Sequence, residues 1–198
     1  MIYLLLDSSD KYLSVGLSKD GNVFDSISYE AWQKQSEFMI QEIKRLMDRN
    51  NLTKDDLAGV VSSRGPGSYT GVRISLSIAK TISFALQIPL YLVSSLECFR
   101  QKDKPTICLM NARSKRSYFA VYKGKDAIIE DKILTNEEVF AYINEHKDYL
   151  ISGDVAYLSL TGEQYDVLSI LSDSVDERHL IKDGLSAKPV YLKDTYLV

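Results

Sequence analysis

The sequence contains the same order of predicted elements twice, three strands followed by a helix and a strand, and this indicates a two-lobed α/β fold. Strands are predicted where apolar and polar residues alternate, and helices where apolar residues recur every three or four positions. The first half is predicted to contain strands at residues 1–6, 13–17 and 23–29, a helix at 31–49, a strand near 59–61, a helix at 70–87 and a strand at 90–93. The second half is predicted to contain strands at 106–110, 117–122 and 127–134, a helix at 135–146 and a strand at 149–151.

The repeat is one of pattern only, because no residue identity links the two halves. We expect an N-terminal lobe at residues 1–104, which carries two long helices and a glycine-rich loop, and a smaller C-terminal lobe at 105–198. A chain of 198 residues, 45% of them hydrophobic, can bury a core without disulfides or structural metal.

Charge and residue counts exclude several classes of function. The net charge of −3 argues against a generally basic nucleic-acid-binding protein. Cys98 and Cys108 form no CxxC pattern, and His146 and His179 form no HxxxH pattern, so a zinc site or a histidine-based hydrolase is not expected. No stretch of the sequence is long and apolar enough to cross a membrane, and we expect a cytoplasmic protein.

The glycine-rich loop at residues 64–73 lies between a predicted strand and a predicted helix, where backbone amides often bind phosphate. It matches neither common phosphate motif, because Val72 follows Gly71 where a Walker A loop has lysine, and Thr70 stands where a dinucleotide fingerprint has glycine. A tight turn with a helix cap and an anion site therefore both remain open for this loop.

Two further features have both an ordinary and a functional explanation. The predicted helix at 70–87 has two apolar faces, so its second face meets either the helix at 31–49 or a partner protein. Residues 100–116 contain six basic residues against a single aspartate, which is either a solvated surface or a contact with RNA phosphate. The residues favoured for such an RNA contact are Arg113, Lys115 and Arg116.

Four segments, taken in order, resemble the TsaB family, which is also called YeaZ. The most specific is the string RGPGSYTGVRI at Arg64–Ile74, and the other three are Asp7-Ser8-Ser9, Asn111-Ala112-Arg113 and Pro189-Val190-Tyr191-Leu192-Lys193. The resemblance is strong over residues 1–95 and weaker after them.

The resemblance implies the acetate kinase/Hsp70/actin-like fold, with two ribonuclease H-like lobes, mixed sheets and here a reduced second lobe. It implies a scaffold that binds and activates TsaD, the subunit that holds ATP and metal and makes threonylcarbamoyladenosine (t6A) in tRNA. The ATPase TsaE joins that complex, tRNA is reached through the complex, and the chain alone is expected to form a homodimer. This chain is therefore expected to have no catalytic residue, cofactor or metal of its own.

The resemblance also assigns roles to individual residues. The vestigial nucleotide-site candidates are Asp7, Ser8, Ser9, Gly65, Gly67 and Ser68. The two first-lobe helices, which match residues 31–49 and 70–87, form the family's partner surface. The expected interface residues are Trp32, Ser36, Met39, Ile43, Ile74, Ile78, Ala79 and Ile82.

The sequence departs from the family pattern at several positions. Gln35 stands where a histidine is frequent, Ser63 stands before the glycine motif where glycine is common, and the HxxxH motif of TsaD is missing. The alternative function is an ATP-dependent, kinase-like enzyme of the same fold acting on a small molecule. That alternative requires Asp7 to act at the end of the first strand.

Overall fold

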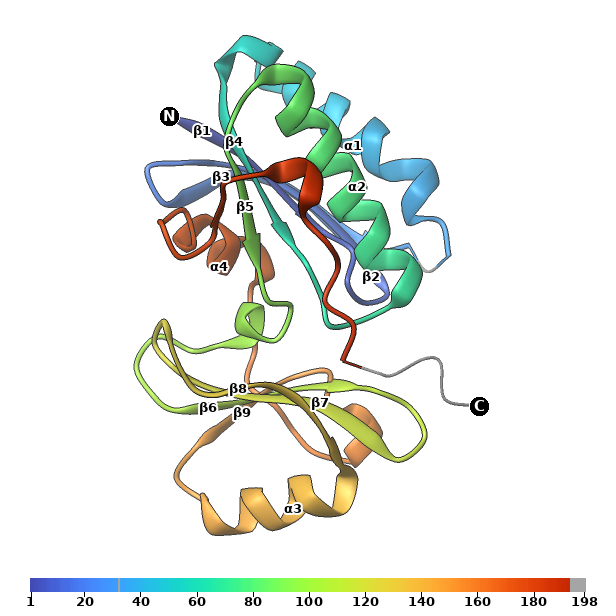
Figure 1. Ribbon diagram of the computed structural model, residues 1–198, viewed down its shortest axis with the longest axis vertical. Helices are drawn as coiled ribbons and strands as arrows, with labels where there is room; N and C mark the ends of the chain where they lie inside the picture. The colour runs from blue at the N-terminus through green and yellow to red at the C-terminus, as the bar shows by residue number, and fades with distance from the viewer. Residues whose placement is uncertain (32, 193–198) are drawn as a thin grey trace.

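The computed structural model describes residues 1–31 and 33–192 and places two β-sheets one above the other (Figure 1). The upper sheet has six strands in the order β10-β5-β4-β1-β2-β3, and the lower sheet has four in the order β8-β7-β6-β9. The upper strands are β1 (Ile2–Asp7), β2 (Tyr12–Lys19), β3 (Asn22–Glu30), β4 (Leu57–Ser63), β5 (Leu90–Val93) and β10 (Leu180–Ile181). The lower strands are β6 (Thr106–Asn111), β7 (Arg116–Lys123), β8 (Asp126–Thr135) and β9 (Leu150–Gly153).

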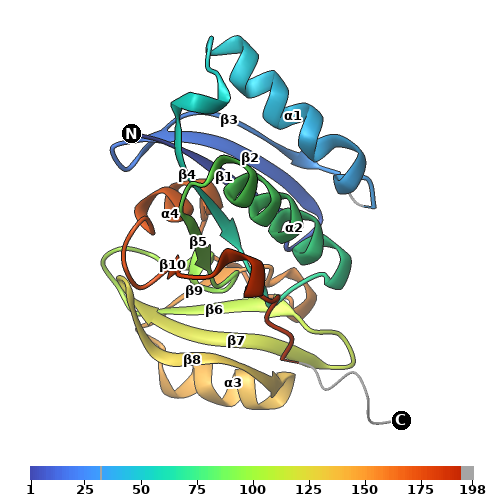
Figure 2. The same cartoon turned by 45° about the horizontal axis from the view of Figure 1, so that its top comes forward.

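Alternation along β1 places helices on both faces of the upper sheet. Leu4 and Leu6 belong to the core cluster under α1 (Gln35–Arg49) and α2 (Tyr69–Leu86), whereas Leu5 packs toward α4 (Val167–Asp173) on the other face. The two long helices lie side by side over one face of this sheet, as both views show (Figures 1 and 2). This arrangement brings the start of α2 to the carboxyl end of β1.

The predicted repeat is confirmed in both sheets. Each contains three successive antiparallel strands, then a helix, then a strand that pairs in parallel with the first strand of the set. The helix of the lower lobe is α3 (Asn136–Glu145), and it begins with a capping box formed by Thr135 and Glu138. Among the described residues, no helix is long and apolar enough to span a lipid bilayer.

The lobe assignment of the last third of the chain needs a correction, because residues 105–198 do not all belong to the smaller lobe. The helix α4 returns to the upper lobe, where Leu168 and Leu171 bury against Leu5 and Val61. The short strand β10 then pairs with β5 at the edge of the upper sheet (Figure 2). The sequence signal is weak beyond Gly153 because these elements have only seven and two residues.

A network of charged side chains joins the two lobes beside these returning segments. Arg100 is almost completely buried and forms an ion pair with Asp173 at 2.5 Å. Lys125, at the β7–β8 turn of the lower lobe, reaches Asp173 at 3.3 Å and Asp176 at 3.6 Å. Arg100 is therefore an interior cation of the upper lobe and not part of an exposed basic surface, whereas Lys125 links the lower lobe to this network.

His179 completes this network between two carboxylates. Its Nδ1 lies 2.8 Å from Asp176 and its Nε2 lies 3.1 Å from the buried Glu97. Burial lowers the pKa of the His179 imidazole, but hydrogen bonding and the charges of Glu97 and Asp176 outweigh burial and raise the pKa above 6.5. Burial raises the pKa of Asp176, but its bonds to Arg178 and His179 outweigh burial and lower the pKa to about 2.

We predict that His179→Gln destabilises the fold in a pH-dependent way. Because the folded-state pKa of His179 is raised, its charge stabilises the fold fully below pH 6.5, and this stabilisation is lost as the pH rises through the folded pKa. Urea unfolding below pH 6.5 should show a loss of about 1 to 3 kcal/mol, shrinking at alkaline pH. His146→Gln is the matched control, because the His146 ring contacts the Tyr142 carbonyl and not a carboxylate. An equal loss at both pH values would contradict the assigned role of the His179 charge.

Candidate functional site

The glycine-rich loop packs directly on the end of β1. The backbone N–H of Ser68 donates to the carbonyl of Ser9 at 2.7 Å, and the Ser8 hydroxyl donates to the carbonyl of Gly71 at 2.7 Å. A Cβ on Gly67 would collide with the Ser9 carbonyl oxygen, and one on Gly71 would collide with that of Ser8. The glycines are therefore needed for close approach of two backbone segments.

Hydrogen-bond donors of this loop are used inside the protein. Ser68 is the N-cap of α2 and its side chain accepts from the Gly71 N–H at 3.2 Å. The Gly65 N–H donates to the Ser95 hydroxyl at 3.1 Å. Of the two explanations left open by the sequence, the structure confirms the tight turn with a helix cap, and it turns the amides of Gly65, Ser68 and Gly71 away from any anion.

Asp7 does not face the space between the lobes. Its carboxylate accepts hydrogen bonds from the Ser63 hydroxyl and, at 3.2 Å, from the Ser9 N–H. Burial raises the pKa of the Asp7 carboxyl, although these hydrogen bonds oppose that effect. The side chain borders a 360 Å³ cavity that it shares with Ser14 and Tyr165 on the α4 side of the sheet.

These residues do not fit the metal and nucleotide that the fold family implies. The Asp7 carboxylate is buried, accepts hydrogen bonds from Ser63 and Ser9 of its own chain, and does not line the interlobe cleft. Over residues 1–31 and 33–192, no group of three or more His, Cys, Asp or Glu side chains is placed to hold a metal ion. That this chain has no cofactor of its own stays a prediction.

We predict that Gly71→Ala damages folding, because the new methyl group would meet backbone and not a movable side chain. The free energy of unfolding should fall by roughly 2 to 4 kcal/mol. Gly184→Ala is the matched control, because a Cβ there meets only ordinary contacts of 3.6 Å or more. Chemical denaturation measures the free energy of unfolding of both variants. Equal values for the two would contradict the prediction, because they would show that the loop can accommodate a methyl group at Gly71.

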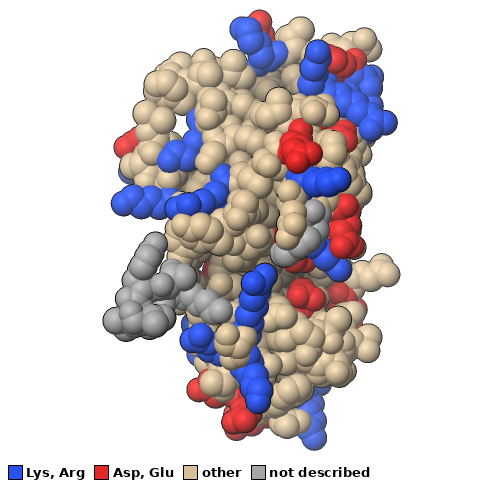
Figure 3. All heavy atoms as spheres, turned by 90° about the vertical axis from the view of Figure 1, so that its right-hand side faces the viewer, with Lys and Arg blue, Asp and Glu red and all other residues tan. Residues whose placement is uncertain are grey.

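A cleft of about 880 Å³ separates the glycine loop from the lower sheet. Its upper wall includes Asp10 and Tyr69, and its lower wall includes Asn111, Arg113 and Asp154. The elements that line it include the starts of α1 and α2 and the β6–β7 turn, which lie on the right-hand side of Figure 1, the side that faces the viewer in Figure 3. The walls carry both signs of charge, in contrast to a uniformly basic phosphate pocket.

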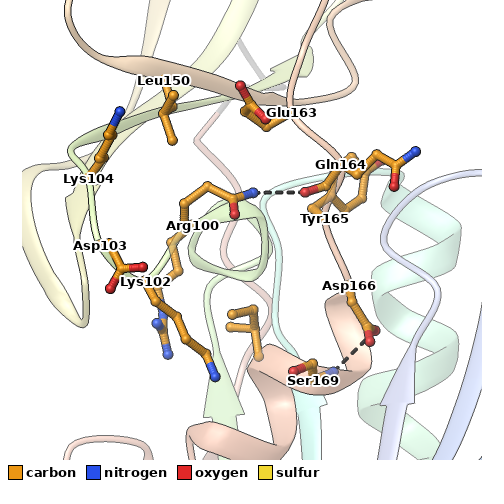
Figure 4. Close-up of a pocket in the computed structure, with 12 residues that line it drawn as sticks. Arg100, Lys102, Asp103, Lys104, Leu150, Glu163, Gln164, Tyr165, Asp166 and Ser169 are labelled. Carbon is orange, nitrogen blue, oxygen red and sulfur yellow. Dashed lines mark hydrogen bonds between the residues drawn. The ribbon is translucent and has the colours of Figure 1, made fainter.

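A second cavity, of about 710 Å³, lies where the chain crosses between the lobes (Figure 4). The two crossing segments are joined by a hydrogen bond from Gln101 Nε2 to the Gln164 carbonyl at 2.8 Å. Lys102 and Lys104 line this cavity together with Glu163 and Asp166. This cavity lies where the two lobes are connected, and its lining carries both positive and negative side chains. It is at the opposite end of β6 from Arg113.

The structure separates the predicted interface residues into two groups. Met39 and Ala79 are 0% exposed and belong to the core under the helices, so the prediction that they contact a partner is wrong. Their apolar character serves packing on the sheet, and monomer core and partner surface look alike in a helical pattern. The remaining residues are exposed or partly exposed, namely Ser36, Ile43, Ile74, Ile78 and Ile82, and Trp32 lies outside the described residues.

The surface of these helices also contains residues that the prediction omitted. Ile40 on α1 is 54% exposed and Phe84 on α2 is 56% exposed. Ile40 widens the apolar stripe of its helix, and this pattern is the sequence signal that could have identified it as a surface residue. The partly exposed isoleucines of α2 pack against the core beside α1, so the second apolar face of α2 is met in part by α1.

The segment before residue 193 lies along another side of α2. Lys80 Nζ donates to the carbonyls of Leu185 at 2.7 Å and Ala187 at 2.8 Å. Tyr191 stacks on Tyr69 with ring centroids 5.1 Å apart, and Arg73 donates to the Tyr191 hydroxyl at 2.7 Å. Tyr191 therefore holds the start of α2 in place through Tyr69 and Arg73. Because these residues are far apart in the sequence, no local sequence pattern predicts this contact.

Comparison with known proteins finds a matching family model and several similar proteins. The family model described as "TsaD: tRNA N6-adenosine threonylcarbamoyltransferase" matches residues 29–171. The tRNA threonylcarbamoyladenosine biosynthesis protein TsaB of Bacillus subtilis is 30% identical over 137 residues, which cover 67% of this chain and 60% of that protein. The protein of the same name from Haemophilus influenzae is 26% identical over 221 residues, covering 96% of this chain and 93% of that protein.

A solved structure shares the fold. YeaZ from Pseudomonas aeruginosa superimposes with a TM-score of 0.81 at 22% identity, covering 96% of this chain and 99% of that chain. This match and the two mixed sheets confirm the expected acetate kinase/Hsp70/actin-like fold. The match to the Bacillus relative spans only about 60% of that protein's length.

Proposed function

Because the chain belongs to the TsaB (YeaZ) family, we propose that it is a non-catalytic subunit in tRNA threonylcarbamoyladenosine synthesis. Its role is to bind and activate a threonylcarbamoyltransferase of the TsaD type. ATP and metal are held by that partner, and TsaE joins the assembly. In the absence of the partner, the same helical surface pairs two copies of this chain.

The observation that carries this proposal is the apolar outer surface of α1 and α2. Ile40 and Phe84 are more than half exposed, and Ile74, Ile78 and Ile82 follow one another along one side of α2. Exposed apolar side chains on neighbouring helices are typical of a protein interface. An enzyme acting alone has no need of this surface.

The glycine-rich loop, whose amides are hydrogen-bonded within the protein, supports the proposal that this chain is not catalytic. The kinase-like alternative requires Asp7 to act at the end of the first strand, and Asp7 instead borders the cavity beside α4 and does not line the interlobe cleft. The loop donates its Gly65, Ser68 and Gly71 amides to its own chain. No observation favours the kinase-like alternative.

We predict that Ile40→Asp weakens binding of the TsaD-type partner from the same organism by at least about tenfold. An aspartate that must be desolvated at an apolar interface commonly costs several kcal/mol. Ile40 is 54% exposed, so the monomer should keep its stability. Size-exclusion chromatography and calorimetric titration of the two purified proteins provide the measurement.

Two further variants make this experiment decisive. Ile78→Asp tests α2 directly. Ile128→Asp is its matched control, because it makes the same substitution at a 47% exposed isoleucine on β8, away from α1 and α2. Thermal unfolding confirms that each variant is folded before binding is compared. Normal partner binding by folded Ile40→Asp and Ile78→Asp would refute the proposed surface, and micromolar ATP binding by the chain alone would refute the non-catalytic role.

A further inference from the structure

The turn between β6 and β7, at residues 111–116, has an unusual backbone. Arg113, Ser114 and Lys115 are consecutive non-glycine residues with φ of 60°, 53° and 56°. Each such residue costs on the order of 1 kcal/mol relative to ordinary backbone conformations. The neighbouring β7–β8 turn places Gly124 in the same region, with φ of 57°, where glycine adopts it without that cost.

Hydrogen bonds hold this turn, which we call the basic turn, in a defined shape. The Arg113 N–H donates to Asn111 Oδ1 at 2.8 Å, and the Arg116 N–H donates to the Arg113 carbonyl at 3.1 Å. The Asn136 N–H at the start of α3 donates to the Lys115 carbonyl at 3.0 Å. The positions from which the side chains project are therefore fixed by the lower lobe.

The three cations of the basic turn are exposed and carry unbalanced charge. Within the part of the chain that the structure describes, Arg113, Lys115 and Arg116 form no ion pair with an acidic group within 4.0 Å. Basic side chains gather over the lower lobe on the face that Figure 3 shows. Arg100, at the start of the basic run, behaves differently, because it is buried against Asp173.

The basic turn lies at the rim of the interlobe cleft. Arg113 lines the lower wall, and the exposed Lys11 lines the upper wall across from it. Asp10 and Asp154 also line the cleft and repel anionic groups from its interior. A polyanion is therefore attracted along the rim and kept out of the cleft.

We propose that the basic turn contacts the phosphate backbone of the RNA substrate while α1 and α2 hold the partner subunit. This inference rests on the proposed function, which makes an RNA the relevant polyanion. Three separate cations on a rigid turn suit successive phosphates, whose neutralisation releases counterions and makes binding depend on salt. A local patch of this kind is compatible with a chain whose net charge is −3.

The test uses the complex of this chain with its TsaD-type partner and an unmodified tRNA transcript. One variant combines Arg113→Asn, Lys115→Asn and Arg116→Gln, because asparagine tolerates the left-handed backbone while removing the charge. The control variant combines Lys102→Gln, Lys104→Gln and Lys147→Gln, three exposed lysines away from the turn, and makes the same change in charge. Fluorescence anisotropy measures tRNA affinity over a series of KCl concentrations.

The basic-turn variant should bind the partner normally but lose at least about tenfold in tRNA affinity near 0.1 M salt. The slope of log affinity against log salt should become shallower by roughly two to three, since each lost phosphate contact removes about 0.7 to 0.9. The control variant should match the native complex. A charge-retaining variant, Arg113→Lys with Lys115→Arg and Arg116→Lys, should keep the native slope.

Two results would overturn the inference while leaving the proposed function intact. One is an unchanged tRNA affinity and salt slope in the basic-turn variant, and the other is tRNA binding that falls equally in the control variant. Loss of partner binding by the basic-turn variant would show that the turn is a protein contact and not an RNA contact. If the native chain binds no partner, the proposed function fails, and the inference fails with it.

Discussion

The close approach of the glycine loop to the end of β1 determines the layout of the upper lobe. The Ser8 hydroxyl and the Ser9 carbonyl bond directly to the loop, and Gly67 and Gly71 leave no room for side chains between the two backbones. This contact starts α2 at Tyr69, aims the helix along the sheet and defines the upper wall of the interlobe cleft. The same contact uses loop donors that a phosphate would need. In this chain, therefore, the motif that most resembles a ligand loop works as a joint between strand and helix.

The ionic network joins the two lobes through Lys125. Arg100 pairs with Asp173, and His179 lies between Asp176 and the buried Glu97. Lys125 extends the network to the lower sheet. Buried charges of this kind require well-placed partners, because an unpaired one is costly. A molecule held in this way presents α1, α2 and the basic turn as parts of one surface. That suits a protein whose work is to position other molecules.

Elements with long, regular patterns could be predicted from the sequence, and elements that depend on distant contacts could not. Strands β1 to β9 and helices α1, α2 and α3 follow from alternation and helical spacing, whereas the two-residue strand β10 does not. The helix α4 has only seven residues and forms because Leu168 and Leu171 find an uncovered sheet face. The apolar faces of α1 and α2 were predicted in outline, but Met39 and Ala79 proved to be core, because periodicity reports apolar faces and not what covers them. The left-handed backbone at 113–115 was not predicted, because its residues are not glycines. The ion pair of Arg100 with Asp173 was not predicted either, because the two residues are far apart in the sequence.

The central claim is that this chain contributes to tRNA modification as an activating partner without catalysing the reaction itself. The most direct measurement is the yield of threonylcarbamoyladenosine on an unmodified tRNA transcript, with the TsaD-type transferase and the other components supplied and this chain either added or withheld. The account predicts that modification depends on the added chain, and that the chain without the transferase yields none. Equal modification with and without the chain, or modification by the chain in the absence of the transferase, would contradict it.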